Sequence, residues 1–120
     1  MPNSVSWFEV VGKDGAALRA FYGKLFDWTI DASDTEMDYG LVAPLPRSIG
    51  GGIGRSEDGG AGHVTFYVEV DDVAAALAKA ESLGGTTVAP PMEIPGWNLT
   101  IGLFADPEGH VIGLSKGALQ

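Results

Sequence analysis

The stretch 63–84 constrains the fold most, because it reads as a β-strand that runs directly into an α-helix. Apolar side chains alternate along 63–70 with a second set that includes His63 and Tyr67, which is the two-residue period of a strand with one apolar face. From Val73 to Leu83 the apolar residues recur at helical spacing. The apolar strand face and the apolar helix stripe are expected to bury each other, which leaves the histidine and the tyrosine facing elsewhere.

The same pattern occurs twice in the chain. Residues 6–28 and 63–85 both contain a strand, an acidic helix cap, an amphipathic helix and an exit from that helix. Each half then adds three strand-like segments, so the order β-α-β-β-β is predicted twice, and an internal repeat of this kind is strong evidence for architecture. We therefore predict an α+β fold of two βαβββ modules, at about residues 4–56 and 62–116, within one domain that spans residues 1–120.

Composition excludes several classes of function. The formal net charge is −9, and the seven lysines and arginines are scattered, which argues against binding to nucleic acid or to anionic membrane surfaces. The chain has no cysteine, which excludes disulfides, zinc–thiolate sites and thiol nucleophiles. The N-terminal residues do not resemble a signal peptide, and no apolar stretch approaches membrane length. We expect a soluble cytoplasmic protein.

Three local patterns give further expectations. The glycine-rich segment 48–54 is predicted to be a strand rather than a flexible linker, because two isoleucines lie inside it and glycine in a strand often marks close approach of a backbone or ligand. Residues 90–97 contain three prolines and are predicted to form a stiffened loop, since proline cannot donate to a sheet. Phe21, Tyr22 and Leu25, with Phe26, are predicted to be core residues of the first helix.

His63, Glu9 and Tyr67 are the candidates for acid–base chemistry. An imidazole titrates near neutrality and can carry protons or donate a hydrogen bond. A strand carboxylate can act as a base if burial raises its pKa. Tyr67 shares the strand face of His63 and can donate to a ligand. For each of the three, a purely structural role is the competing interpretation.

A second set of residues is predicted to line a pocket for a flat or aromatic compound. The glycines at 50–52 would leave room for it. Trp28 and Tyr39 could also form part of its wall, but a core or interface role is favoured for both. The predicted ligand-binding residues are Trp7, Thr65, Met92, Trp97, Gly51 and Gly113.

Four sequence segments together resemble one known family. They are FEV, AFYGKLF, GHVTFYVEVDDV and FADPEGHVIGL, and they span nearly the whole chain. They resemble the vicinal oxygen chelate superfamily, which contains glyoxalases, bleomycin-resistance proteins and extradiol dioxygenases, and in particular its small actinobacterial-type, glyoxalase-like members. The resemblance implies that the two modules form a curled mixed sheet, a half-barrel, around a cavity. It also implies a homodimer.

The resemblance points to the position of a metal site, but most of the ligands expected there are missing from this sequence. In metal-dependent members four side chains on the central strands hold one divalent ion, and their positions fall here at about Val5, within Gly50–Gly52, at His63 and at Gly113. Of these positions only His63 offers a ligand. A catalytic zinc site needs three protein ligands, so we predict no metal and no other cofactor.

Three hypotheses about function follow. The first is a protein that binds an apolar or aromatic metabolite or antibiotic at a degenerate, metal-free site. The second is a metal-independent isomerase, hydratase or cyclase that uses His63 with Glu9 or Tyr67. The third, and weakest, is a metal-dependent lyase or dioxygenase whose ligands lie at other positions. Whether the protein is an enzyme stays open, because many activities share this scaffold.

Overall fold

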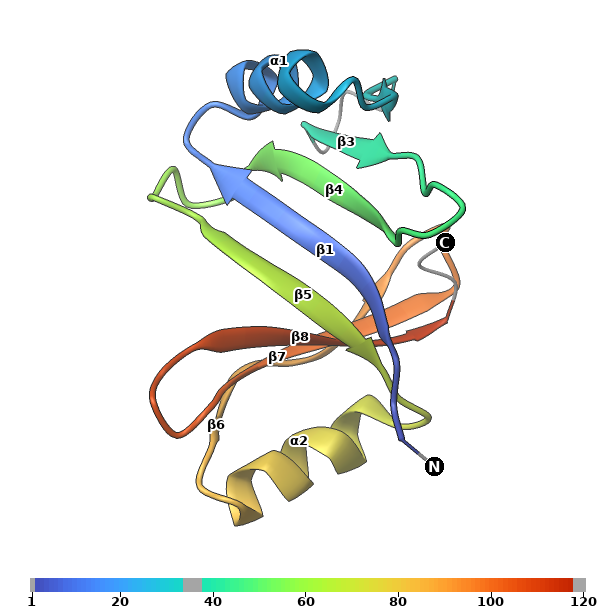
Figure 1. Cartoon of the computed structure of the whole chain (residues 1–120). Helices are drawn as coiled ribbons and strands as arrows, with labels where there is room; N and C mark the ends of the chain where they lie inside the picture. The colour runs from blue at the N-terminus through green and yellow to red at the C-terminus, as the bar shows by residue number, and fades with distance from the viewer. Residues whose placement is uncertain (1, 34–37, 118–120) are drawn as a thin grey trace. The chain divides into compact units, whose positions relative to one another are not determined.

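The computed structural model describes residues 2–33 and 38–117 of the chain. The chain divides into two compact units (Figure 1). The first unit runs over Trp7–Val64, and the second joins the start of the chain, up to Ser6, with the part from Thr65 onward. Among the described residues, no helix is long and apolar enough to cross a membrane.

The order of elements is β-α-β-β-β, repeated once, as predicted from the sequence. The first five elements are β1 (Val5–Gly12), α1 (Gly15–Phe26), β2 (Ile30–Asp31), β3 (Tyr39–Val42) and β4 (Gly50–Arg55). The next five are β5 (His63–Glu69), α2 (Val73–Ser82), β6 (Thr86–Ile94), β7 (Leu99–Ala105) and β8 (Val111–Gly117).

In the first unit the strands follow the order β2-β3-β4-β1. β1 and β4 are parallel, and the other neighbours are antiparallel. The glycine-rich segment forms β4, which confirms the prediction of a strand. Asp14 caps α1 by accepting a hydrogen bond from the Ala17 backbone N–H at 3.0 Å, so the free N–H groups of the first turn gain an acceptor.

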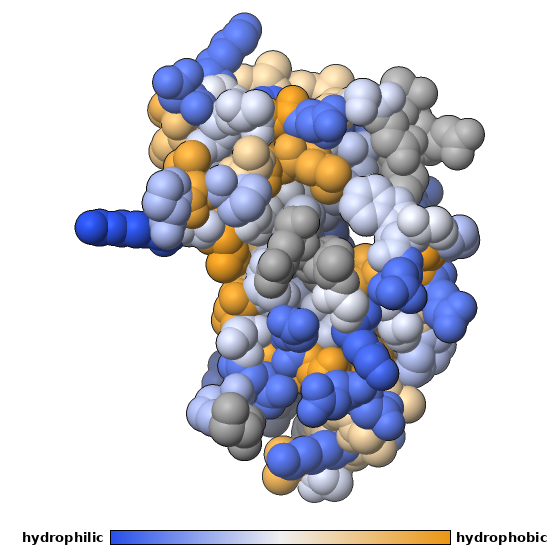
Figure 2. All heavy atoms as spheres, turned by 90° about the vertical axis from the view of Figure 1, so that its right-hand side faces the viewer, coloured by the Kyte–Doolittle hydropathy of each residue, from blue (hydrophilic) through white to orange (hydrophobic). Residues whose placement is uncertain are grey.

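The prediction that the aromatic stripe of α1 is core is wrong for three of its four residues. Phe21, Leu25 and Phe26 are 58%, 59% and 52% exposed. Figure 2 shows exposed hydrophobic residues of the protein in orange on one of its faces. The less exposed stripe of α1 is instead Gly15, Leu18, Arg19, Tyr22 and Gly23. The less exposed stripe differs from the predicted apolar stripe because it includes Arg19.

Arg19 can be largely buried because its guanidinium is paired and hydrogen-bonded. It donates to the backbone carbonyls of Asp38 and Ile53, each at 3.2 Å, and forms a 2.9 Å ion pair with the Asp38 carboxylate. A buried charge is tolerated when it is paired and hydrogen-bonded. Arg19 therefore fastens α1 to the sheet next to β3 and β4.

In the second unit the strands follow the order β5-β8-β7-β6. Asp72 caps α2 by accepting from the Ala75 backbone N–H at 3.0 Å. The buried core of this unit contains Val73 and Leu77 of α2 and Leu114 of β8, with partly buried apolar neighbours that include Val68. The predicted burial of the strand against the helix therefore holds for the end of β5 that leads into α2.

The apolar face predicted for β5 is not buried along its whole length. Val64 is 76% exposed and Phe66 is 40% exposed, whereas Val68 and Val70 pack against the core. The reason is the short link between β5 and α2, since a helix that starts at Val73 covers only the adjacent end of the strand.

The loop predicted over residues 90–97 is wrong for 90–94, whereas 95–97 do lie in a turn. β6 continues through Pro90 and Pro91 to Ile94, with irregular register between Thr87 and Met92. Among the strands of the described residues, β6 is the last in its order and pairs only with β7. Pro90 and Pro91 lie where the register is irregular, between the pairs Ala89–Leu103 and Met92–Ile101. Proline is tolerated at such a bulge in an edge strand because the ladder does not use its missing N–H there.

Candidate functional site

A chain of hydrogen bonds in the first unit has Glu9 at its centre. The Nε2 atom of His63 lies 2.7 Å from Oε1 of Glu9, and the Tyr39 hydroxyl donates to Oε2 of Glu9 at 2.7 Å. The indole N–H of Trp7 donates to the Tyr39 hydroxyl oxygen at 3.0 Å. Two of the three predicted acid–base residues, His63 and Glu9, are therefore in direct contact.

The strands place these side chains through their register. Trp7 and Glu9 are two residues apart on β1, so they share one face. Glu9 lies opposite Gly52 of β4, and Tyr39 of β3 lies opposite Gly54. A side chain on Gly52 would collide with the Tyr39 ring and its hydroxyl. The glycine at position 52 therefore lets the tyrosine cross β4 and reach Glu9.

This arrangement corrects the expectation that the glycines at 50–52 leave room for a ligand. The ring of Phe8 lies over Gly51, and the edge of Trp7 lies over Gly50 at 3.3 Å from an added Cβ. The space next to each glycine is filled by an aromatic ring of the same unit. Gly51 therefore packs against the Phe8 ring in this structure, and its predicted role in ligand binding stays a prediction.

The site combines a buried carboxylate with an accessible imidazole. The Glu9 side chain is 12% exposed, whereas the His63 side chain is 33% exposed. The hydrogen bond to Glu9 raises the pKa of His63 above its ordinary value; burial opposes this shift, and the negative charge of Glu9 adds to it. A histidine tuned in this way is typical of sites that hold or move a proton.

Replacing Glu9 by glutamine is expected to lower the pKa of His63, because the bond and the charge that raise it are both lost. The pKa of His63 is read from its imidazole resonances in an NMR titration, with a His110→Gln variant used to assign the two histidines. A pKa that is the same in both proteins would contradict the assigned cause.

The same pair makes stability depend on pH. His63 has a higher pKa in the folded than in the unfolded chain, so folding favours its protonated form. The resulting stabilisation is complete below the unfolded value of 6.5 and is lost as the pH rises through the folded value. Urea unfolding across this pH range should show the loss of stability with rising pH in the unchanged protein. Glu9→Gln should not show that loss.

Tyr67, Thr65 and Gly113 lie together in the second unit. Tyr67 and Thr65 are buried, and the Tyr67 ring covers Gly113, where an added side chain would collide with it. The Thr65 hydroxyl donates to the Val111 carbonyl at 2.6 Å. Among the remaining candidates, Met92 and Trp97 are exposed. The roles predicted for these residues in catalysis or binding stay predictions.

The described residues do not fit a divalent metal site. No group of three or more histidine, aspartate and glutamate side chains within 2–33 and 38–117 could hold an ion. His63 and Glu9 are bonded to each other, and the positions at Val5, Gly50–Gly52 and Gly113 supply no donor side chain.

Tyr39 is the residue of this chain of hydrogen bonds that the sequence analysis placed below the others, because a core or interface role was favoured for it over a place in the pocket wall. One signal was present in the sequence, namely glycine at the alternate positions 50, 52 and 54 of a predicted strand. Such spacing leaves one face of the strand without side chains, so that another group can approach it closely. The sequence could not say which aromatic residue fills that space.

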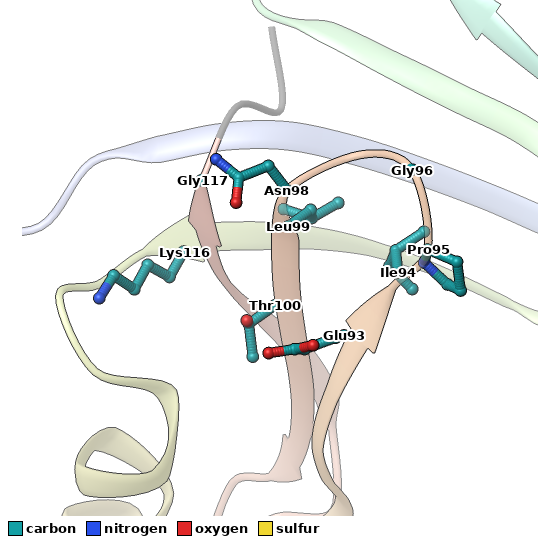
Figure 3. A pocket seen from close by; sticks show the side chains of 9 residues that line it. All are labelled: Glu93, Ile94, Pro95, Gly96, Asn98, Leu99, Thr100, Lys116 and Gly117. Atoms are coloured by element: carbon teal, nitrogen blue, oxygen red, sulfur yellow. The ribbon is translucent and has the colours of Figure 1, made fainter.

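A separate pocket lies in the second unit at the β6–β7 turn (Figure 3). Glu93, Thr100 and Lys116 are neighbours across β6, β7 and β8 in the sheet register. None of the predicted site residues lines this pocket. Its lining residues are Glu93, Ile94, Pro95, Gly96, Asn98, Leu99, Thr100, Lys116 and Gly117.

Comparisons with known proteins agree with the repeated fold. A family model described as a glyoxalase-like domain matches residues 9–115. The anthracycline biosynthesis protein DnrV of Streptomyces peucetius is 29% identical over an alignment that covers 99% of this chain and 49% of DnrV. The chain thus spans about half the length of the curated relatives it matches.

Two solved structures illustrate the likeness in three dimensions. A glyoxalase/bleomycin resistance protein/dioxygenase superfamily member from Vibrio splendidus has a TM-score of 0.66 at 10% identity, covering 96% of this chain and 99% of that protein. A methylmalonyl-CoA epimerase variant from Streptomyces coelicolor, in complex with 2-nitronate-propionyl-CoA, has a TM-score of 0.61 at 13% identity, covering 99% and 97%. At these identities the likeness establishes the fold alone, which confirms the predicted α+β fold of two βαβββ modules.

Proposed function

Because the chain belongs to the glyoxalase-like domain family, we propose that it binds a small organic molecule at the sheet face that carries Trp7, Glu9, Tyr39 and His63. The family match bears out the resemblance to the vicinal oxygen chelate superfamily that was noted in the sequence. The observation that carries the proposal is an accessible imidazole supported by a buried carboxylate, which is itself held by a tyrosine.

The composition of this face supports an apolar or aromatic ligand, either a metabolite or an antibiotic. The partly exposed ring of Tyr39 lies next to the polar pair, and binding sites for small molecules typically combine apolar walls with a few placed polar groups. The relative from Streptomyces peucetius is named for anthracycline biosynthesis, and the epimerase structure holds a CoA ester. Both lend weight to an organic ligand.

A thermal-shift screen of a metabolite library tests this proposal. Compounds that raise the melting temperature of the protein should bind His63→Gln at least about tenfold more weakly, because one lost hydrogen bond to a charged group is worth about 1.5–3 kcal/mol. His110→Gln is the matched control, since His110 is exposed and pairs with Asp106 at 2.9 Å. Hits that bind His63→Gln with unchanged affinity would contradict the proposed site.

Proton transfer at a carbon next to a carbonyl group is the second candidate function. The direct His63–Glu9 contact favours this function, because a carboxylate that accepts a hydrogen bond from an imidazole makes that imidazole a stronger base. The test is exchange of such a proton in D₂O, followed by NMR on the compounds found in the screen. An enzyme should lose this exchange in His63→Gln, whereas a pure binding protein shows no exchange in either form.

We propose that this site works without a metal ion, as the poor fit of the described residues suggests. Elemental analysis of the purified protein should find well below one divalent ion per chain. One tightly held ion per chain would overturn this proposal and favour a metal-dependent lyase or dioxygenase. A homodimer and a cytoplasmic location are further proposals that rest on the sequence and the resemblance, and light scattering of the purified protein tests the dimer.

A further inference from the structure

The direction of one hydrogen bond at the site is fixed by chemistry. The indole nitrogen of Trp7 can only donate, so the Tyr39 hydroxyl oxygen accepts from it at 3.0 Å. The hydroxyl has a single proton, and it lies 2.7 Å from Oε2 of Glu9. The Tyr39 proton therefore points to the carboxylate.

The next bond in the chain follows from the first. An ionised carboxylate has only acceptor capacity, so Oε1 of Glu9 needs a donor from the histidine that lies 2.7 Å away. That donor is Nε2–H of His63. In a neutral imidazole one nitrogen carries the proton and the other is an acceptor, which leaves Nδ1 as the acceptor. Among the described residues, no hydrogen-bond partner of Nδ1 is recorded.

We infer that neutral His63 is held as the Nε2–H tautomer and offers Nδ1 as a proton acceptor, so that the site selects ligands with an acidic O–H or N–H group, such as a phenol, an enol or an imide. This inference rests on the proposed function and deepens it by naming the class of ligand. A ligand that has only acceptor atoms, such as an ether, gains no bond from Nδ1. Trp7 and Tyr39 are positioning residues in this scheme, because they act on the ligand through Glu9 and His63.

The first test is the tautomer of His63 in the full chain. Long-range ¹H–¹⁵N correlation spectra of ¹⁵N-labelled protein, recorded above the His63 transition, distinguish a protonated Nε2 from a protonated Nδ1. The expected result is the Nε2–H pattern. An Nδ1–H pattern would overturn the inference while leaving the proposed binding function to its own test, which depends on affinity and not on the tautomer.

The second test exploits the position of the Tyr39 proton. In Glu9→Gln the amide oxygen should accept from Tyr39, which turns the amide NH₂ toward His63. Nε2 must then accept, so the tautomer should switch to Nδ1–H. The double variant Glu9→Gln/Tyr39→Phe removes the hydroxyl that orients the amide, so the amide oxygen can turn toward His63 and the Nε2–H form should return. A tautomer that does not change in Glu9→Gln would contradict the proposed chain, since a merely structural role of these residues predicts no switch and no rescue.

The third test compares phenol with anisole, which has the same ring and oxygen but no proton to donate. Phenol should perturb the His63 imidazole resonances at a concentration at least about fivefold lower than anisole, and the preference should disappear in Glu9→Gln. Equal responses to the two probes would overturn the assigned ligand class. The proposed function fails on a different result, namely a library screen in which no hit depends on His63.

Discussion

Replacing Gly62 by alanine is expected to destabilise the protein by about 2–5 kcal/mol, because a strained backbone and a steric collision add together. Gly62 has a φ of +78°, a conformation that costs an L-residue about 1–2 kcal/mol. Its missing side chain also faces the backbone carbonyl of Val11, with which a Cβ would collide. Backbone atoms cannot move aside as a flexible side chain can, so the local structure must shift.

Gly59→Ala is the matched control for this prediction. Gly59 lies three positions earlier in the same connector with a φ of +72°, and nothing lies within 4 Å of an added Cβ. This variant should lose only about 1–2 kcal/mol of stability, which is what a positive φ costs an L-residue. Urea unfolding measures both free energies, and similar values for the two variants would show that the collision with Val11 is relieved at little cost. Because Gly62 directly precedes His63, the variant should also disturb the His63 resonances.

Replacing Arg19 by methionine is expected to cost about 2–4 kcal/mol, because it leaves partly buried acceptors without a donor. The Arg19 side chain is 15% exposed and engages two backbone carbonyls and the Asp38 carboxylate. Methionine keeps much of the apolar stem, so the loss reports mainly on the guanidinium contacts. Asp38 has a φ of +48° and directly precedes Tyr39, so the variant should also loosen the tyrosine that holds Glu9.

Arg55→Met separates the buried from the exposed ion pair on the same carboxylate. The Arg55 side chain is 61% exposed, and its Nε lies 3.5 Å from the other oxygen of Asp38. An exposed pair of this kind contributes about 0–1 kcal/mol. Chemical unfolding should therefore rank Arg19→Met well below Arg55→Met in stability. Equal losses would mean that the backbone carbonyls contacted by Arg19 find other partners.

The site was predicted only in part, for a reason that the individual residues make clear. His63 and Glu9 were selected because each is a titratable residue on the less apolar face of a recognisable strand. Their contact depends on pairing between segments more than fifty residues apart in the chain. Tyr39 was assigned to the core because an aromatic residue in a short strand gives no local sign of the partner that its hydroxyl reaches. That partner follows from the register of β3 on β4 and of β4 on β1.

The sequence by itself determined the repeated β-α-β-β-β order, the acidic helix caps and the glycine-rich strand, because periodicity and capping act between residues close together in the chain. Tertiary structure alone decided which face of α1 is buried, because Arg19 finds its acceptors on distant strands. It also decided that β6 continues through two prolines, because both lie at an irregularity of an edge strand, where the pairing with β7 does not use their missing N–H groups. The filling of the glycine positions by Phe8, Tyr39 and Tyr67 has the same origin, since side-chain packing across strands depends on long-range register.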